Sequence, residues 1–148
     1  MSLDQWRENG WLHPHEPSLR ETAELLEVAD RALADARVEG LTADARVALA
    51  YPAVVALGAA ALAASGYRAG RDRHHERIID SLSYTAGIEP QAVGRFHRYR
   101  RLRNEMTYER VGRLSGHEAE RLVSYVEELR TAIVAWLRAT HPRVMSPD

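Results

Sequence analysis

The stretch VALAYPAVVALGAAALAA, residues 47–64, carries no charged side chain over eighteen consecutive positions. By length alone it reaches the threshold for a membrane-spanning helix. Half of its residues are alanine, however, only six are valine or leucine, and Pro52 lies inside it. This composition is more typical of a helix surrounded by other helices, because alanine and Gly58 let neighbouring backbones come close. We therefore predict that the stretch is the core helix of a helical bundle.

Helix boundaries can be recognised on this stretch and on the segment before it. Thr42 is a candidate N-cap for a helix that ends near Ser65, and Pro52 is expected to kink or restart that helix. The preceding segment opens with the capping-box sequence Ser18-Leu-Arg-Glu21 and shows helical spacing of apolar residues over about 19–38.

Three more helices are expected in the second half of the chain. Pro90 suits the first position of one helix, and Ser115-Gly-His-Glu118 is a second capping box. The expected ranges are 72–86, 90–108 and 116–140. No segment shows the alternation of apolar and polar residues that indicates a strand. The sequence thus predicts an all-α fold, a mostly antiparallel four- to five-helix up-and-down bundle over residues 18–140.

The two ends of the chain lie outside this predicted domain. Residues 1–17 have neither a helical nor a strand period, so they are expected to form an irregular N-terminal arm whose Trp6 and Trp11 pack on the bundle. Residues 141–148 are expected to form a short tail. The first residues are acidic and polar, unlike a signal peptide.

The chain contains no cysteine, which excludes thiolate nucleophiles, disulfides and cysteine-ligated zinc. Nothing in the composition requires an oxidising compartment, so we expect a cytoplasmic protein.

Positive charge is concentrated in one part of the sequence. The net charge is only −1, and all twenty basic residues are arginine. Residues 67–113 hold eleven arginines and six acidic residues, a net charge of +5, while the rest of the chain carries −6. The basic part of such an unevenly charged chain suits an anionic partner, for example one that carries phosphate.

The densest part of this region is RYRRLRNEMTYE, residues 98–109. On a helix, Tyr99, Leu102 and Met106 share a face that should enter the core, with Phe96 at its edge. A continuous polar strip is expected beside that face, in the order Arg103, Thr107, Arg100, Asn104, Tyr108, Arg101. Arginine and asparagine donors suit phosphate oxygens, and Tyr108 offers a hydroxyl and a ring. The alternative is that these arginines only pair with carboxylates or solvate a helix end.

The sequence Arg103-Asn104-Glu105-Met106-Thr107-Tyr108 resembles the signature of the HEPN superfamily. In ribonucleases of that superfamily, an arginine and a polar residue precede a histidine. The alanine-rich helix that ends before Gly66-Tyr67-Arg68, and the following His74-His75, resemble a bacterial subgroup with tyrosine in place of that histidine. The resemblance covers about residues 18–140.

This resemblance implies a homodimer in which both motif helices face a shared cleft. It also implies one of three roles: a metal-independent ribonuclease, a toxin subunit beside a nucleotidyltransferase antitoxin, or a noncatalytic partner that binds RNA or a nucleotide. Arg103 and Asn104 match the motif directly. Tyr108 does not match the catalytic histidine, and Arg110 stands where many toxins have a second tyrosine.

The tyrosine at this position weakens the case for catalysis. A phenol with a pKa near ~10 is about one-thousandth ionised at pH 7, whereas histidine titrates near neutrality. Losing a matched acid–base group typically costs about 10²–10⁴ in rate. Tyr108 would be a useful base only if neighbouring arginines lowered its pKa, and His97 is the best other candidate. No catalytic residue is therefore assigned; the candidates are Arg103, Tyr108 and His97.

Two histidine clusters invite a metal site, but neither predicts one. Adjacent helical side chains diverge by about 100°, so the two histidines of His74-His75-Glu76 cannot easily share an ion. The loop sequence His13-Pro14-His15 lacks a third ligand nearby. We expect no metal and no cofactor.

The sequence therefore favours a protein that binds RNA or a nucleotide in a basic dimer cleft, with a regulatory or toxin–antitoxin-like role. The expected binding residues are Arg100, Arg101, Arg103, Asn104 and Tyr108. The first alternative is a metal-independent endoribonuclease. A further alternative is a bundle that binds only a protein partner, such as a separately encoded nucleotidyltransferase.

Overall fold

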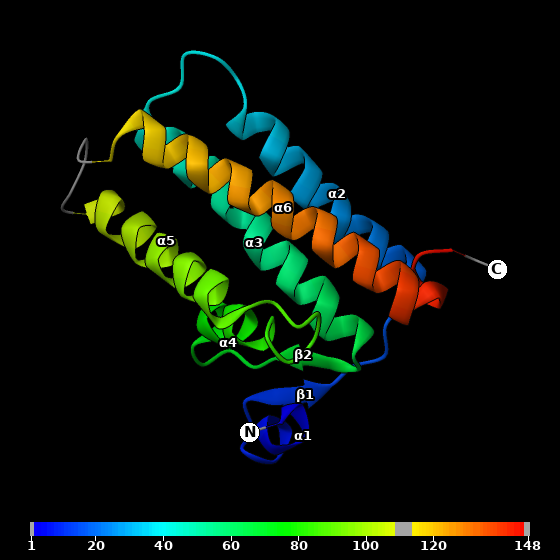
Figure 1. The fold of residues 1–148 in the computed structure, drawn as a ribbon. Coiled ribbons are helices and arrows are strands. Elements are labelled where there is room, and N and C mark those ends of the chain that lie inside the picture. Colours follow the sequence, from blue (N-terminus) through cyan, green and yellow to red (C-terminus); the bar gives the residue numbers. More distant parts are fainter. Residues whose placement is uncertain (1, 109–113, 147–148) are drawn as a thin grey trace.

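The computed structural model describes residues 2–108 and 114–146, and of residues 105–108 only the backbone. Its elements are α1 (Leu3–Glu8), β1 (Leu12–Pro14), α2 (Leu19–Ala36), α3 (Ala43–Ala64), β2 (Tyr67–Ala69), α4 (His74–Ser81), α5 (Pro90–Tyr108), α6 (Gly116–Thr140) and the 3₁₀ helix η1 (Pro142–Val144). The long helices α2, α3, α5 and α6 run alongside one another, and α1, α4 and the small sheet gather at one end (Figure 1). The predicted helical bundle is confirmed.

Helix α3 is the centre of this bundle. It contacts α2, α4, α5, α6 and β2, and most of its side chains are buried. It is long and apolar enough to cross a membrane, but 72% of its most apolar window is covered by the protein itself. The uncharged stretch therefore serves as a core helix, as the sequence predicts.

Pro52 does not restart this helix, which is one element from Ala43 to Ala64. Of the two expected effects, the restart is wrong, and a kink at Pro52 stays a prediction. Proline cannot donate to the carbonyl of Ala48, but both residues lie on the exposed side of α3, where water can satisfy that carbonyl.

The predicted helix starts are confirmed at three N-caps. The hydroxyls of Ser18, Thr42 and Ser115 each accept a hydrogen bond from the backbone N–H three residues later, at 3.0–3.1 Å. The capping box of α2 is only half formed, because the Glu21 carboxylate bonds His15 Nε2 at 2.8 Å. Helix α2 is thereby tied to the segment that precedes it.

Helix α4 is shorter than the predicted 72–86. Arg73 has a left-handed backbone with φ of 50°, so the helix begins only after it. At the other end, Ser81 donates its hydroxyl to the carbonyl of Ile78, and Thr85 donates to the carbonyl of Ser81. Hydroxyl side chains that bond the backbone in this way favour turns over a continued helix.

The N-terminal arm is not irregular, which corrects the prediction. Ser2 and Gln5 form a reciprocal capping box that opens α1. Strand β1 pairs antiparallel with β2, with Leu12 opposite Ala69. Three-residue strands are too short to display a period, so sequence alone could not reveal them. The packing of Trp6 and Trp11 on the bundle is confirmed.

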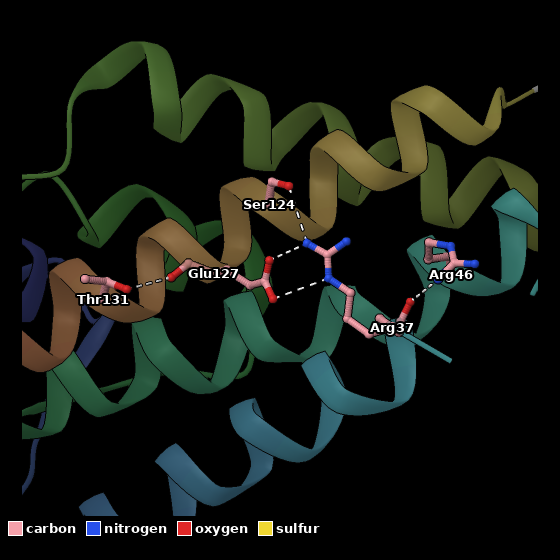
Figure 2. Close-up of polar contacts among 6 residues, drawn as sticks. Arg37, Arg46, Ser124, Glu127 and Thr131 are labelled. Atoms are coloured by element: carbon pink, nitrogen blue, oxygen red, sulfur yellow. Dashed lines mark hydrogen bonds and ion pairs between the residues drawn. The ribbon is translucent and has the colours of Figure 1, made fainter. Parts of the chain in front are cut away.

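Two arginines join the C-terminal end of α2 to α6 and α3 (Figure 2). Arg37 donates to Glu127 on α6 and, at 3.4 Å, to Ser124. The hydrogen bond to Glu127 is the largest cause of the raised pKa of Arg37. Arg46 on α3 donates to the carbonyls of Ala36 and Val38, which satisfies acceptors at the C-terminus of α2.

Candidate nucleic-acid interface

Helix α5 carries the basic stretch and enters the bundle along one face. Phe96 and Tyr99 are buried as predicted, and Leu102 is half-buried against the core. Val93 is buried as well. The side chain of Met106, the fourth residue assigned to this face, lies outside the described residues.

The polar strip on α5 is not one continuous surface. Arg100 and Arg103 are half-buried, whereas Arg101 and Asn104 are exposed. The difference arises because α3 and α4 both pack against α5, so the inward sector of the helix is wider than its apolar stripe. The predicted site therefore separates into an inner pair and an outer pair of side chains.

The inner arginines lie around Tyr51, a residue of α3 that the sequence analysis did not single out. The Arg103 guanidinium carbon lies 5.2 Å from the centre of the Tyr51 ring. The Tyr51 hydroxyl lies 3.3 Å from Nδ1 of His75, at the start of α4. Tyr51 is 1% exposed, so its ring lies beneath the arginines. Arg100 and Arg103, together with Tyr51, His75 and Glu76, are called the inner cluster below.

Burial and positive charge act on the ionisable groups of the cluster. Burial raises the pKa of Tyr51 to about 12, although Arg100 and Arg103 pull it down. Burial also lowers the pKa of His75, and the charges of His74, Arg103 and Arg100 act in the same direction. At pH 7 the phenol is therefore protonated and the imidazole is neutral.

Arg100 completes this inner cluster. Its Nη1 lies 3.6 Å from Oε1 of Glu76 on α4, and its side chain is only 17% exposed. Its buried Nε has no hydrogen-bond partner in the described part of the chain. The cluster therefore has donor capacity that its own carboxylate leaves unused.

His97, predicted to lie near Asn104 and Tyr108, has a carboxylate partner on α4. Its Nε2 lies 2.5 Å from Oδ1 of Asp80 on α4, and only 17% of the side chain is exposed. The histidine thus joins α5 to α4. The side chain of Tyr108 lies outside the described residues, although the backbone of α5 extends to that position.

Three of the four histidines weighed as metal ligands have other partners in the fold. His15 bonds Glu21, His74 bonds the carbonyl of Gly70, and His75 faces Tyr51. Across residues 2–108 and 114–146, no group of three or more His, Asp or Glu side chains is arranged to hold a metal ion.

Sequence reasoning missed Tyr51, and it considered His75 as a possible metal ligand and as part of the resemblance but not as a partner of Arg103. A signal for Tyr51 was present, because its hydroxyl is the only polar side-chain group in the stretch 47–64. Its partners come from segments 24 and 52 residues further along, so the sequence could not identify them.

Comparisons with known proteins give no match to this chain, whether with protein-family models, with curated proteins or with solved structures. The resemblance to the HEPN superfamily therefore rests on the motif and the order of the helices.

Proposed function

We propose that this chain is a HEPN-like protein that binds RNA, or a nucleotide as its smallest fragment, in a basic cleft formed by the α5 helices of two copies. Its nuclease activity is weakened or absent, and its role is regulatory or toxin–antitoxin-like, in the cytoplasm. The observation that carries this proposal is the arrangement of Arg100 and Arg103, half-buried on one side of α5 against Tyr51 and Glu76.

An arginine held in this way is well suited to phosphate. Its guanidinium presents donors in a planar fork, and a side chain already packed on a ring loses little freedom when a ligand binds. The exposed Arg101 and Asn104 follow on the same helix and can contact neighbouring phosphates. Contacts of this kind give affinity without sequence preference.

Binding is favoured over cleavage because no histidine stands at position 108. His97, the first substitute, is held by Asp80. A site that keeps its phosphate-binding donors but lacks a matched acid–base group can bind RNA and cleaves it poorly.

The binding experiment uses a fluorescent mixed-sequence single-stranded RNA, titrated at two salt concentrations. We expect Arg103→Ala, and Arg100→Ala with Arg101→Ala, to weaken binding at least about tenfold and to reduce the salt dependence. The matched control is Arg31→Ala, which removes an exposed arginine paired with Glu27 on α2. Equal losses in all three variants would mean nonspecific attraction, and no binding by the wild type would refute the proposal.

The shared cleft has its own test. Light scattering at micromolar concentration is expected to give the mass of two chains. A monomer at that concentration would remove the dimer cleft, and binding by α5 would then have to be explained within one chain.

One observation favours a second candidate function, a metal-independent endoribonuclease. His75 and Arg103 contact the same Tyr51 ring, and a neutral imidazole beside arginines has the chemistry of a general base. In this version His75 would accept the proton of the RNA 2′-hydroxyl while Arg103 stabilises the phosphate.

Cleavage of RNA in excess chelator separates the two functions. Wild-type cleavage that disappears in both Arg103→Ala and His75→Asn would support the nuclease. RNA binding without cleavage, and cleavage gained by Tyr108→His, would support binding as the present function. Absence of both binding and cleavage would favour the bundle that binds only a protein, such as a nucleotidyltransferase.

A further inference from the structure

Helix α2 leaves one side uncovered, beside the seam that it forms with α3. A hollow of about 460 Å³ lies along this seam, and Leu49 and Pro52 of α3 form part of one wall. The other wall is the outer side of α2, where Val28 is 50% exposed. Figure 1 shows α2 and α5 on opposite sides of the bundle. This surface is therefore separate from the site proposed for RNA.

The outer side of α2 carries exposed charges of both signs. At 100° per residue, six exposed residues fall within a sector of about 100°. They are called the α2 stripe below: Arg20, Glu24, Glu27, Val28, Arg31 and Asp35. The two other acidic residues of this helix have partners within the chain. Glu21 bonds His15, and Asp30 bonds Arg130 on α6.

The charge order of the α2 stripe is complementary to itself. A second α2 that runs antiparallel to the first, with a two-fold axis between positions 27 and 28, places its Asp35 opposite Arg20. The same register places its Arg31 opposite Glu24. Within Leu19–Ala36, no other antiparallel register gives both arginines an acidic residue directly opposite. Two-fold symmetry repeats each pair, so this register forms four ion pairs between the copies.

The arginines of the stripe can bind these additional carboxylates. Each already lies 3.1 Å from an acidic neighbour on its own helix, Arg20 from Glu24 and Arg31 from Glu27. All four side chains are at least 64% exposed, so water screens both pairs. A guanidinium has five N–H donors and can bind a second carboxylate. The carboxylate of Asp35 forms no ion pair within the ranges 2–108 and 114–146.

The residues next to the axis limit the strength of such a contact. In this register the two Val28 side chains meet and cover each other, which removes exposed apolar surface from water. The two Glu27 carboxylates also approach each other, and each keeps its own Arg31. Each copy thus brings two arginines and three acidic residues. The repulsion between the two Glu27 side chains opposes the other attractions.

We propose that α2 binds α2 of a second copy of this chain in an antiparallel, two-fold symmetric contact. Arg20 pairs with Asp35, Glu24 pairs with Arg31, and Val28 packs against Val28. Exposed ion pairs and one helix face give a small interface, so we expect association at about 0.1–1 mM. The contact does not use α5. It would join two monomers, or two of the dimers proposed above, at high protein concentration.

Disulfide trapping tests the register directly. The chain has no cysteine, so an introduced cysteine is its only thiol. Val28→Cys lies next to the axis and should form a disulfide between copies under mild oxidation. The matched control is Ala34→Cys, also exposed on α2, whose two copies lie about 20 Å apart in this register. We expect Val28→Cys to be trapped at least about tenfold faster. Equal rates, or no disulfide in Val28→Cys, would overturn the proposal.

Charge exchange tests the ion pairs. Sedimentation equilibrium between about 10 µM and 1 mM should show the average mass of the wild type rising with concentration. Glu24→Arg and Arg31→Glu are each expected to weaken this association at least about fivefold, because each places like charges opposite one another. The double variant restores opposite charges and should recover most of the association. A double variant as weak as the single ones would contradict the pairing.

Two further variants separate this contact from general electrostatic attraction. Glu27→Gln removes the repulsion at the axis and should strengthen the association. Arg7→Glu reverses an exposed arginine on α1 and should leave it unchanged. Weaker association in Arg7→Glu, equal to that of Arg31→Glu, would mean that net charge controls the association and would overturn the proposal. Failure of RNA binding, or of the α5 cleft, would leave it intact.

Discussion

Gly58 and Ile78 are in closer contact than any side chain at position 58 would allow. A Cβ atom on Gly58 would lie 2.5 Å from Cγ2 of Ile78 and 3.3 Å from its carbonyl oxygen. The backbones of α3 and α4 therefore approach each other at this point. Because α4 carries His75 and Glu76, this contact positions two members of the inner arginine cluster.

Gly58→Ala tests this close approach. Overpacking typically costs about 1–3 kcal/mol, whereas alanine gains about 1 kcal/mol over glycine inside a helix. We expect a net loss of about 1 kcal/mol in the free energy of unfolding, and a larger loss for Gly58→Val, measured by urea denaturation. The control is Gly94→Ala on α5, where nothing lies within 4 Å and only the gain should appear. A stabilised Gly58→Ala variant would show that α4 can move away freely.

The pH dependence of stability should reflect His75. Its pKa is lowered in the folded protein, so between that value and 6.5 the unfolded chain binds the extra proton. Stability therefore rises with pH through this window and is reduced below it. His141, whose pKa is lowered by burial, acts in the same direction. His75→Asn should flatten the rise in Tm below pH 6.5. A rise that persists unchanged in this variant would contradict the assignment to His75.

At alkaline pH, the ionisation of Tyr51 should make the stability of the protein fall as pH rises. Its pKa is raised from 10.0 to about 12 in the folded chain, so the unfolded chain loses the proton first. The contribution of Tyr51 to stability is complete below pH 10 and falls as pH rises toward 12. Tyr51→Phe should remove the latest step in a spectrophotometric titration of the tyrosines. A late step that persists in this variant would assign it to another phenol.

The Arg37–Glu127 pair should contribute little to stability despite its good geometry (Figure 2). Both side chains are 44% exposed, so water and salt screen their attraction. A double-mutant cycle with Arg37→Ala and Glu127→Ala is expected to give a coupling energy of about 0.5–1 kcal/mol that shrinks in high salt. A salt-independent coupling of several kcal/mol would indicate a desolvated pair instead.

Trp6 should contribute most to the packing of the N-terminal arm on the bundle. It is 5% exposed and packs with Leu12, Leu62 and Ile78, so Trp6→Ala is expected to cost about 3 kcal/mol. Trp6→Phe should cost much less than the lost volume suggests. Its indole Nε1 is buried with no hydrogen-bond partner among the described residues, and phenylalanine removes that unsatisfied donor. Urea denaturation measures the free energy of unfolding of both variants. A Trp6→Phe cost as large as that of Trp6→Ala would contradict the view that the indole nitrogen is an unsatisfied donor.

Much of the fold could be predicted because its signals are local. The caps Ser18, Thr42 and Ser115 mark helix starts by bonds that span only three residues. The uncharged composition of residues 47–64 indicated a core helix, since a helix without a polar face has to be covered over most of its surface. The two small strands escaped prediction because β1 and β2 stabilise each other across more than fifty residues.

The candidate site could be predicted only in part, for the same reason. Local periodicity placed the arginines on one helix and buried Phe96 and Tyr99. It could not show that Arg100 and Arg103 are half-buried while Arg101 and Asn104 are exposed. That difference depends on the two helices that pack against α5, and helix packing is a long-range property.

The sequence by itself determined the helical class, the core helix and the helix that carries the arginines, because hydrophobic periodicity and capping act over a few residues. Only the tertiary structure decided which arginines meet. It brought Tyr51, His75 and Glu76 to Arg100 and Arg103, and it placed Arg121 of α6 beside Arg95 and Arg98 of α5. Such groupings join segments far apart in the chain, so they exist only once the helices have packed.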